Sequence, residues 1–263
     1  MADDGERRML FDTRGKRKNV IRVVYAILAL LMGTSLFFVV GPVNIGEIIG
    51  NSASTEASEV FDEQAERIER KLETEPGKEE QLLIQLTRAR INAGNSLVVV
   101  EPGELTREVT PEARDEYDKA LEAWERYVAA TDEPNPALAQ LVGATFFQLA
   151  ETAGGVRAVT ESIATAAEAQ QISTAARPST ASYSTLAYYE YYDGNFKAGD
   201  KAKRRAIDEA ATKQEVNAVE AQLKELRKQA KEFDERKQQA IEAEKAGQGE
   251  GGNPFGGGAG LGG

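Results

Sequence analysis

This sequence lacks several of the residue types that usually carry acid–base, nucleophilic or metal chemistry. It has 263 residues with no His and no Cys, which removes His bases, Cys nucleophiles, haem and iron–sulfur ligation and the usual zinc sites. Segment Gly194–Lys201, GNFKAGDK, is similar to a phosphate loop, but it lacks the Ser or Thr after Lys and follows a helical pattern. Carboxylates are plentiful, yet they stand beside Lys and Arg as on solvated helix faces. We therefore expect no catalytic, cofactor or metal site and no enzyme; a hydrolase with a carboxylate pair is the alternative.

Tyrosines form the densest aromatic cluster of the chain. On a helix, Tyr188 and Tyr192 share one face, whereas Tyr191 lies nearer the Leu186–Ala187 side. We predict that Tyr188, Tyr189 and Tyr192 contact a bound protein or peptide, because Tyr offers a large contact area at low entropic cost. Packing between neighbouring helices, with hydroxyls at the edge, is the alternative.

The charge balance bears on the kind of partner. The formal net charge is −11, and duplex binding needs clustered Lys and Arg to displace counterions. We therefore expect no nucleic acid partner. The absence of Cys fits an extracytoplasmic domain without disulfides and a cytosolic domain equally well.

An uncharged apolar run, Val23–Val43, precedes everything that could position these tyrosines. A helix over this run is about 30 Å long, which matches the hydrocarbon core of a bilayer. The run follows a basic segment, and the next basic residue is Arg67. The sequence therefore predicts a single transmembrane helix with a cytoplasmic N-terminus and an extracytoplasmic remainder. A cleaved signal peptide or a buried soluble helix is the alternative.

Helical spacing dominates the rest of the chain, with Gly, Pro and Asn breaks between segments. The run Leu97–Val100, inside an expected loop, is the exception, and Thr110–Pro111 is expected to open a helix as N-cap and first residue. The expected apolar stripes are Phe61–Leu72, Leu82–Ala93, Tyr117–Val128, Leu138–Leu149, Val156–Ala167, Tyr183–Tyr191 and Phe196–Ile207.

Segment Pro178–Ala211 resembles a tetratricopeptide repeat. The places of the family pattern hold Tyr183, Leu186, Ala187, Tyr191, Gly194, Asn195, Phe196, Gly199 and Ala206. Segments 79–95 with 111–132, and 135–173, are similar but looser pairs. The turn glycines Gly94, Gly154 and Gly194 lie 60 and 40 residues apart, whereas the family repeat is about 34 residues long, and Lys203 stands where an aromatic residue is usual. An irregular helical bundle is the alternative.

The C-terminal third combines a heptad pattern with a glycine-rich tail. Apolar residues at heptad spacing are Val216, Val219, Leu223, Leu226, Ala230 and Phe233, and Lys237 falls on the same seam. We expect a capping helix over the last repeat; self-association through the seam is the alternative. Residues 247–263 are expected to be a disordered tail, in which Phe255 could be part of a short linear motif.

These observations predict an all-α fold. It consists of a transmembrane helix, a tetratricopeptide-like α-solenoid of antiparallel helix pairs and a long C-terminal capping helix. The expected parts are a basic cytoplasmic tail (1–19), the transmembrane helix (20–43), a linker (44–58), the repeat domain (59–212), the C-terminal helix (213–246) and the tail (247–263). The chain resembles membrane-anchored tetratricopeptide proteins of bacterial envelopes. The resemblance implies a scaffold or chaperone-like factor in the cell membrane that binds a protein or peptide partner. A structural homo-oligomer assembled through the C-terminal helix is the alternative.

Overall fold

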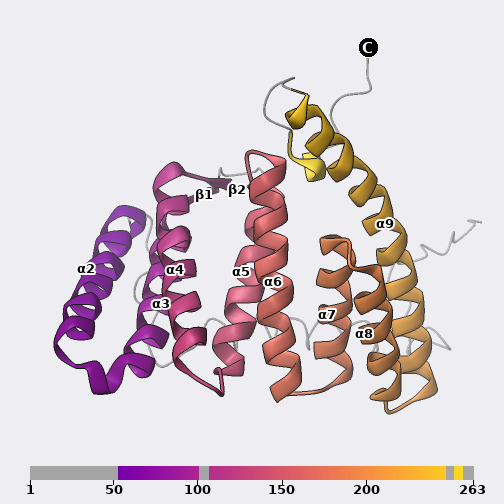
Figure 1. Cartoon of the computed structure of the whole chain (residues 1–263), viewed down its shortest axis with the longest axis horizontal. Helices are drawn as coiled ribbons and strands as arrows, with labels where there is room; N and C mark the ends of the chain where they lie inside the picture. The colour runs from indigo at the N-terminus through magenta and orange to yellow at the C-terminus, as the bar shows by residue number, and fades with distance from the viewer. Residues whose placement is uncertain (1–52, 101–106, 247–251, 257–263) are drawn as a thin grey trace, which may run out of the picture. The chain divides into compact units, whose positions relative to one another are not determined.

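Helices make up nearly all of the chain that the computed structural model describes, which is residues 53–100, 107–246 and 252–256. The predicted all-α class is therefore confirmed for these residues (Figure 1). The α-helices are α2 (Ala53–Thr74), α3 (Glu79–Ser96), α4 (Pro111–Ala130), α5 (Pro136–Thr152), α6 (Val156–Ala176), α7 (Thr180–Asp193), α8 (Phe196–Asp208) and α9 (Lys213–Lys245).

Local capping signals explain where several helices begin. The Thr110 side chain accepts a hydrogen bond from the Ala113 amide at 3.1 Å, with Pro111 as the first residue of α4, as the sequence predicts. Other N-caps that satisfy the first free amides of a helix through a side chain are Asn135, Ser179, Asn195 and Thr212. These starts are therefore encoded locally.

Consecutive helices pack as pairs. α3 packs on α4, α5 on α6 and α7 on α8, and α6 joins the second pair to the third through α7 (Figure 1). Helices α7 and α8 approach each other closely at Gly199, where an added Cβ would overlap the Tyr191 ring. Short side chains at Ala202 and Ala206, both buried, continue this contact. The pairing expected from the sequence is confirmed as helix packing.

Helix α2 begins at Ala53, inside the stretch that we interpreted as a linker. Ala and Glu in this stretch have good helix propensity, so α2 begins earlier in the chain than we expected. Its expected apolar stripe faces inward, with Ala65 and Ile68 buried against Leu82 and Leu86 of α3.

A small antiparallel β-hairpin interrupts the helical pattern between α3 and α4. Strand β1 (Val98–Val100) pairs with β2 (Arg107–Val109), and Val99 is opposite Glu108. The apolar run expected in a loop is therefore a strand. Its partner was not predicted, because three residues with two charges give no strand signal.

The apolar seam of α9 packs on α7 and α8. Four of its residues are buried: Val219, Leu223, Ala230 and Phe233. Lys237 on the same seam is also buried, and its Nζ donates to the backbone oxygen of Asp193 at 3.0 Å, near the C-terminus of α7. Lys237 therefore extends the contact between α9 and α7.

The predicted membrane span, Val23–Val43, lies outside the described residues. Within the described ranges, none of the helices is both long enough and apolar enough to cross a bilayer.

Candidate functional site

Aromatic side chains from three helices meet on one side of α7. We call this group the aromatic site: Phe147 of α5, Tyr188, Tyr189 and Tyr192 of α7, and Phe233 of α9. Tyr188 and Tyr192 are one turn apart and share a helix face. The site therefore depends on α5 and α9 both packing near α7.

Ring contacts in the aromatic site are close. The Phe147 ring stacks on Tyr189 with centroids 4.5 Å apart, and it lies 4.6 Å from Tyr188. Tyr192 makes an edge contact with Tyr188 at 5.0 Å and lies 5.2 Å from Phe233. Such pairs each contribute about 0.5–1.5 kcal/mol beyond the burial of their area. The side chains of the aromatic site are therefore held in place by their contacts with one another.

The tyrosine hydroxyls of the aromatic site stay uncharged near neutral pH. Burial raises the pKa of Tyr189 to about 12. Burial, followed by the proximity of Tyr192 and Glu151, raises the pKa of Tyr188, and burial raises that of Tyr192. The tyrosines therefore present neutral hydroxyls and apolar rings to a ligand, with the charged groups of Glu151 and Arg236 nearby.

A segment of the C-terminal tail lies on the aromatic site. We call Asn253–Phe255 the tail segment; Pro254 and Phe255 belong to the short helix η3 (Pro254–Gly256). The Phe255 ring lies 4.4 Å from Phe233 and stacks on Tyr192 at 5.8 Å with an interplanar angle of 10°. We expected a disordered tail here, whereas Pro254–Gly256 form a short helix and the Phe255 ring lies against α7 and α9.

The structure brings together the three tyrosines that we predicted from the sequence. Tyr188 and Tyr192 are half-buried, whereas Tyr189 is 7% exposed and forms the floor of the site under Phe147. Tyr191 points to the other face, where its hydroxyl donates to Asp200 at 3.0 Å. Phe147 and Phe233 were not predicted as site residues: Phe233 was expected only on the apolar seam of the C-terminal helix, and Phe147 only within the expected helix around 138–149.

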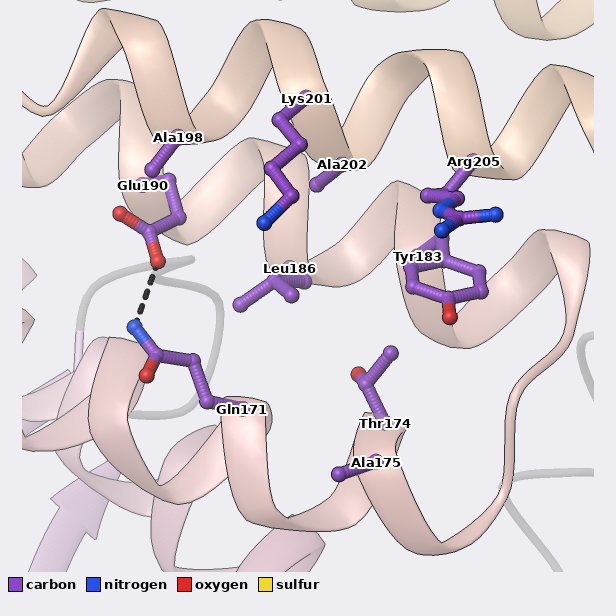
Figure 2. Close-up of a pocket in the computed structure, with 10 residues that line it drawn as sticks. All are labelled: Gln171, Thr174, Ala175, Tyr183, Leu186, Glu190, Ala198, Lys201, Ala202 and Arg205. Carbon is purple, nitrogen blue, oxygen red and sulfur yellow. Dashed lines mark hydrogen bonds between the residues drawn. The ribbon is translucent and has the colours of Figure 1, made fainter.

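A pocket of about 430 Å³ lies on the other side of α7, between α6 and α8 (Figure 2). Leu186, Ala198 and Ala202 give it an apolar floor, and the exposed side chains of Lys201 and Arg205 come from α8. The remaining lining residues are Gln171, Thr174, Ala175, Tyr183 and Glu190. No sequence signal pointed to this pocket, because its residues come from three helices.

Glu190 is the buried acid of this pocket, with 3% of its surface exposed. Burial raises its pKa above the ordinary value, and the nearby Asp193 adds to this. Hydrogen bonds from Gln171 (2.7 Å, dashed in Figure 2) and Asn195 lower the pKa, but they do not outweigh burial. The folded protein therefore holds this proton more tightly than the unfolded chain does.

Replacing Glu190 with Gln is expected to flatten part of the pH dependence of stability. Because the pKa of Glu190 is higher in the folded state, ionisation favours unfolding, and wild-type stability is lost as the pH rises above about 4.5. The Gln variant lacks this loss, so its free energy of unfolding should exceed that of the wild type at pH 7 and not at pH 4. Urea titrations at both pH values measure the difference. The control is Glu122→Gln, which removes a carboxylate from the exposed face of α4; a similar pH-dependent gain there would contradict the assignment.

The chain matches no protein-family model, and neither a curated protein nor a solved structure matches it.

Proposed function

We propose that this protein is a single-pass membrane protein whose helical domain binds a protein or peptide partner as a scaffold or chaperone-like factor. The observation that carries the proposal is the tail segment on the aromatic site. This short segment, a single 3-10 turn with the Asn before it, lies there through side-chain stacking and hydrogen bonds. A surface that receives one short peptide segment has the shape and chemistry to receive another.

The tetratricopeptide-like interpretation is supported by the α7–α8 pair. Gly194 ends α7 with φ 91° and its amide bonds back to the carbonyls of Glu190 and Tyr191, and Asn195 caps α8. Gly199 lies against Tyr191 where the family pattern has a small residue. Such repeats bind extended peptides on surfaces formed by several helices.

The membrane part of the proposal rests on the run Val23–Val43 and on the basic residues before it. Two measurements test it. The protein should stay in the membrane fraction in alkaline carbonate, and protease added to spheroplasts should digest the bulk of the chain. Release by carbonate would contradict the anchor, and full protection from protease would contradict the orientation.

The aromatic site offers two side chains to a partner. Tyr188 and Tyr192 keep partly exposed rings, and their neutral hydroxyls can donate or accept at the edge of a contact. Tyr189 supports them from below. We therefore propose Tyr188 and Tyr192 as direct contacts and Tyr189 as a positioning residue.

Site-specific photo-crosslinking in intact membranes tests this assignment. A benzoylphenylalanine replaces Tyr188 or Tyr192 in the full chain, and the matched control replaces Tyr183, which is half-buried on the same helix but lines the pocket of Figure 2. We expect adducts with a second protein from the first two positions and not from the third. Adducts from Tyr183 alone would move the site to the pocket, and the absence of adducts at all three would contradict partner binding.

The alternative of a homo-oligomer assembled through the heptad seam gains no support from the packing of α9. The seam residues Val219, Leu223 and Phe233 are buried within a single chain. A second copy would have to displace α7 and α8 to reach them.

A further inference from the structure

We propose that the tail segment is a displaceable ligand of the aromatic site, and that the partner of this site carries the same chemistry. That chemistry is a side-chain amide followed two residues later by an aromatic ring in a tight turn. The inference rests on the proposed function, and it adds the kind of ligand and the way in which the chain regulates its own site.

Asn253 provides the polar half of the recognition. Its Nδ2 donates to the backbone oxygens of Ala150 (3.3 Å), Glu151 (3.1 Å) and Ala153 (2.8 Å) at the C-terminal end of α5. The last carbonyls of a helix lack partners within the helix and carry partial negative charge. An amide donor fits this place, whereas a carboxylate would be repelled and could not donate.

The same Asn side chain shapes the turn that presents the aromatic ring. Its Oδ1 accepts a hydrogen bond from the backbone amide of Phe255 at 2.8 Å, which closes a turn over the buried Pro254. The ring of Phe255 then reaches Phe233, Tyr192 and, at 6.4 Å, Phe147. The site therefore binds both groups of the tail segment: α5 accepts hydrogen bonds from the side-chain amide of Asn253, and α7 and α9 contact the ring of Phe255.

A short tether joins this ligand to its own receptor. Six residues, 247–252, separate the tail segment from Ala246 at the end of α9, and four of them are Gly. A tether of this length keeps the segment near the site at an effective concentration of about 1 mM. A free ligand must compete with this supply, so its apparent affinity falls in proportion to the fraction of sites that are open.

The binding experiment uses the full chain and a fluorescent peptide with the sequence of residues 251–257, GGNPFGG. Wild type is compared with the double variant Asn253→Asp/Phe255→Ala, which lacks the donor and the ring. Gly252→Ala is the matched tail control, because a Cβ there meets nothing within 4 Å. We expect the double variant to bind the peptide at least about tenfold more tightly than wild type and Gly252→Ala. A peptide GGDPAGG should not bind.

Several outcomes would overturn the inference. These are equal affinity for wild type and the double variant, equal binding of the two peptides, or a double variant that has lost its helical circular dichroism, since the segment would then be a fixed part of the fold. A wild-type dimer that becomes a monomer in the double variant would also overturn it, because the tail would then act between copies. If the peptide fails to bind while crosslinks from Tyr188 and Tyr192 still capture a protein, the inference fails and the proposed function stands.

Discussion

Replacing Arg90 with Met is expected to lower the free energy of unfolding by about 3 kcal/mol. Arg90 lies on α3 with 4% of its surface exposed, and its guanidinium joins three helices. It bonds to Glu116 of α4 at 2.8 Å, to Glu69 of α2 at 2.7 Å, and to Asp62 of α2. Met fills much of the volume but leaves the buried Glu116 with Lys119 alone, at 2.8 Å.

The charge of Arg90 is secure, so the loss does not depend on its titration. Burial on its own would lower the pKa of this guanidinium, but the hydrogen bonds to Glu69 and Glu116 outweigh burial and raise the pKa above the ordinary value. Glu69 and Asp62 are about half exposed and can be hydrated after the substitution. This is why we expect a loss at the lower end of the range for broken buried pairs, which is about 3–5 kcal/mol.

Urea unfolding of the full-length protein, followed by circular dichroism, measures this loss. Arg126→Met is the matched control, because Arg126 and Glu79 are both 50% exposed and 3.7 Å apart. Exposed pairs contribute about 0–1 kcal/mol. Hydrogen exchange should also accelerate in α2 of the Arg90 variant, since two of the three carboxylates come from that helix. Equal destabilisation by both substitutions would show that Arg90 has no special role.

The helix pairs could be predicted from the sequence because their signals are local. Thr110 before Pro111 marks the start of α4, and Gly194–Asn195 marks the turn between α7 and α8. The Arg90 network could not be predicted in the same way. Its partners Asp62, Glu69 and Glu116 lie 28, 21 and 26 residues away in the sequence. The sequence does not indicate which of the many charged residues is buried.

Half of the candidate site was visible in the sequence and half was not. Tyr188 and Tyr192 stood out by number and spacing. The contact between Asn253 and the end of α5 spans 100 to 103 residues, so only its local part, an Asn two residues before Phe255, can be read from the chain. The heptad seam was ambiguous for a related reason: its pattern requires a partner surface and does not say which, and α7 and α8 supply that surface here.

Replacing Phe233 with Ala is expected to destabilise the fold by about 3–5 kcal/mol. This ring is 1% exposed and connects α9 to the aromatic site through Tyr192 at 5.2 Å. Its removal leaves a cavity that the rigid neighbours, already stacked on one another, can fill only in part. The tail segment should be released as well, because Phe255 loses the nearest of its ring contacts.

The matched substitution, Phe255→Ala, separates the two effects. Phe255 is half-buried and belongs to a segment that we propose to be displaceable, so its loss should lower the unfolding free energy of the helices by less than about 1.5 kcal/mol. In a double-mutant cycle, the two rings, 4.4 Å apart, should show a coupling of about 0.5–1.5 kcal/mol. Zero coupling would mean that Phe255 does not lie on Phe233 in solution. A loss from Phe255→Ala as large as that from Phe233→Ala would mean that the tail is part of the core, and a ligand could then not displace it without unfolding α9.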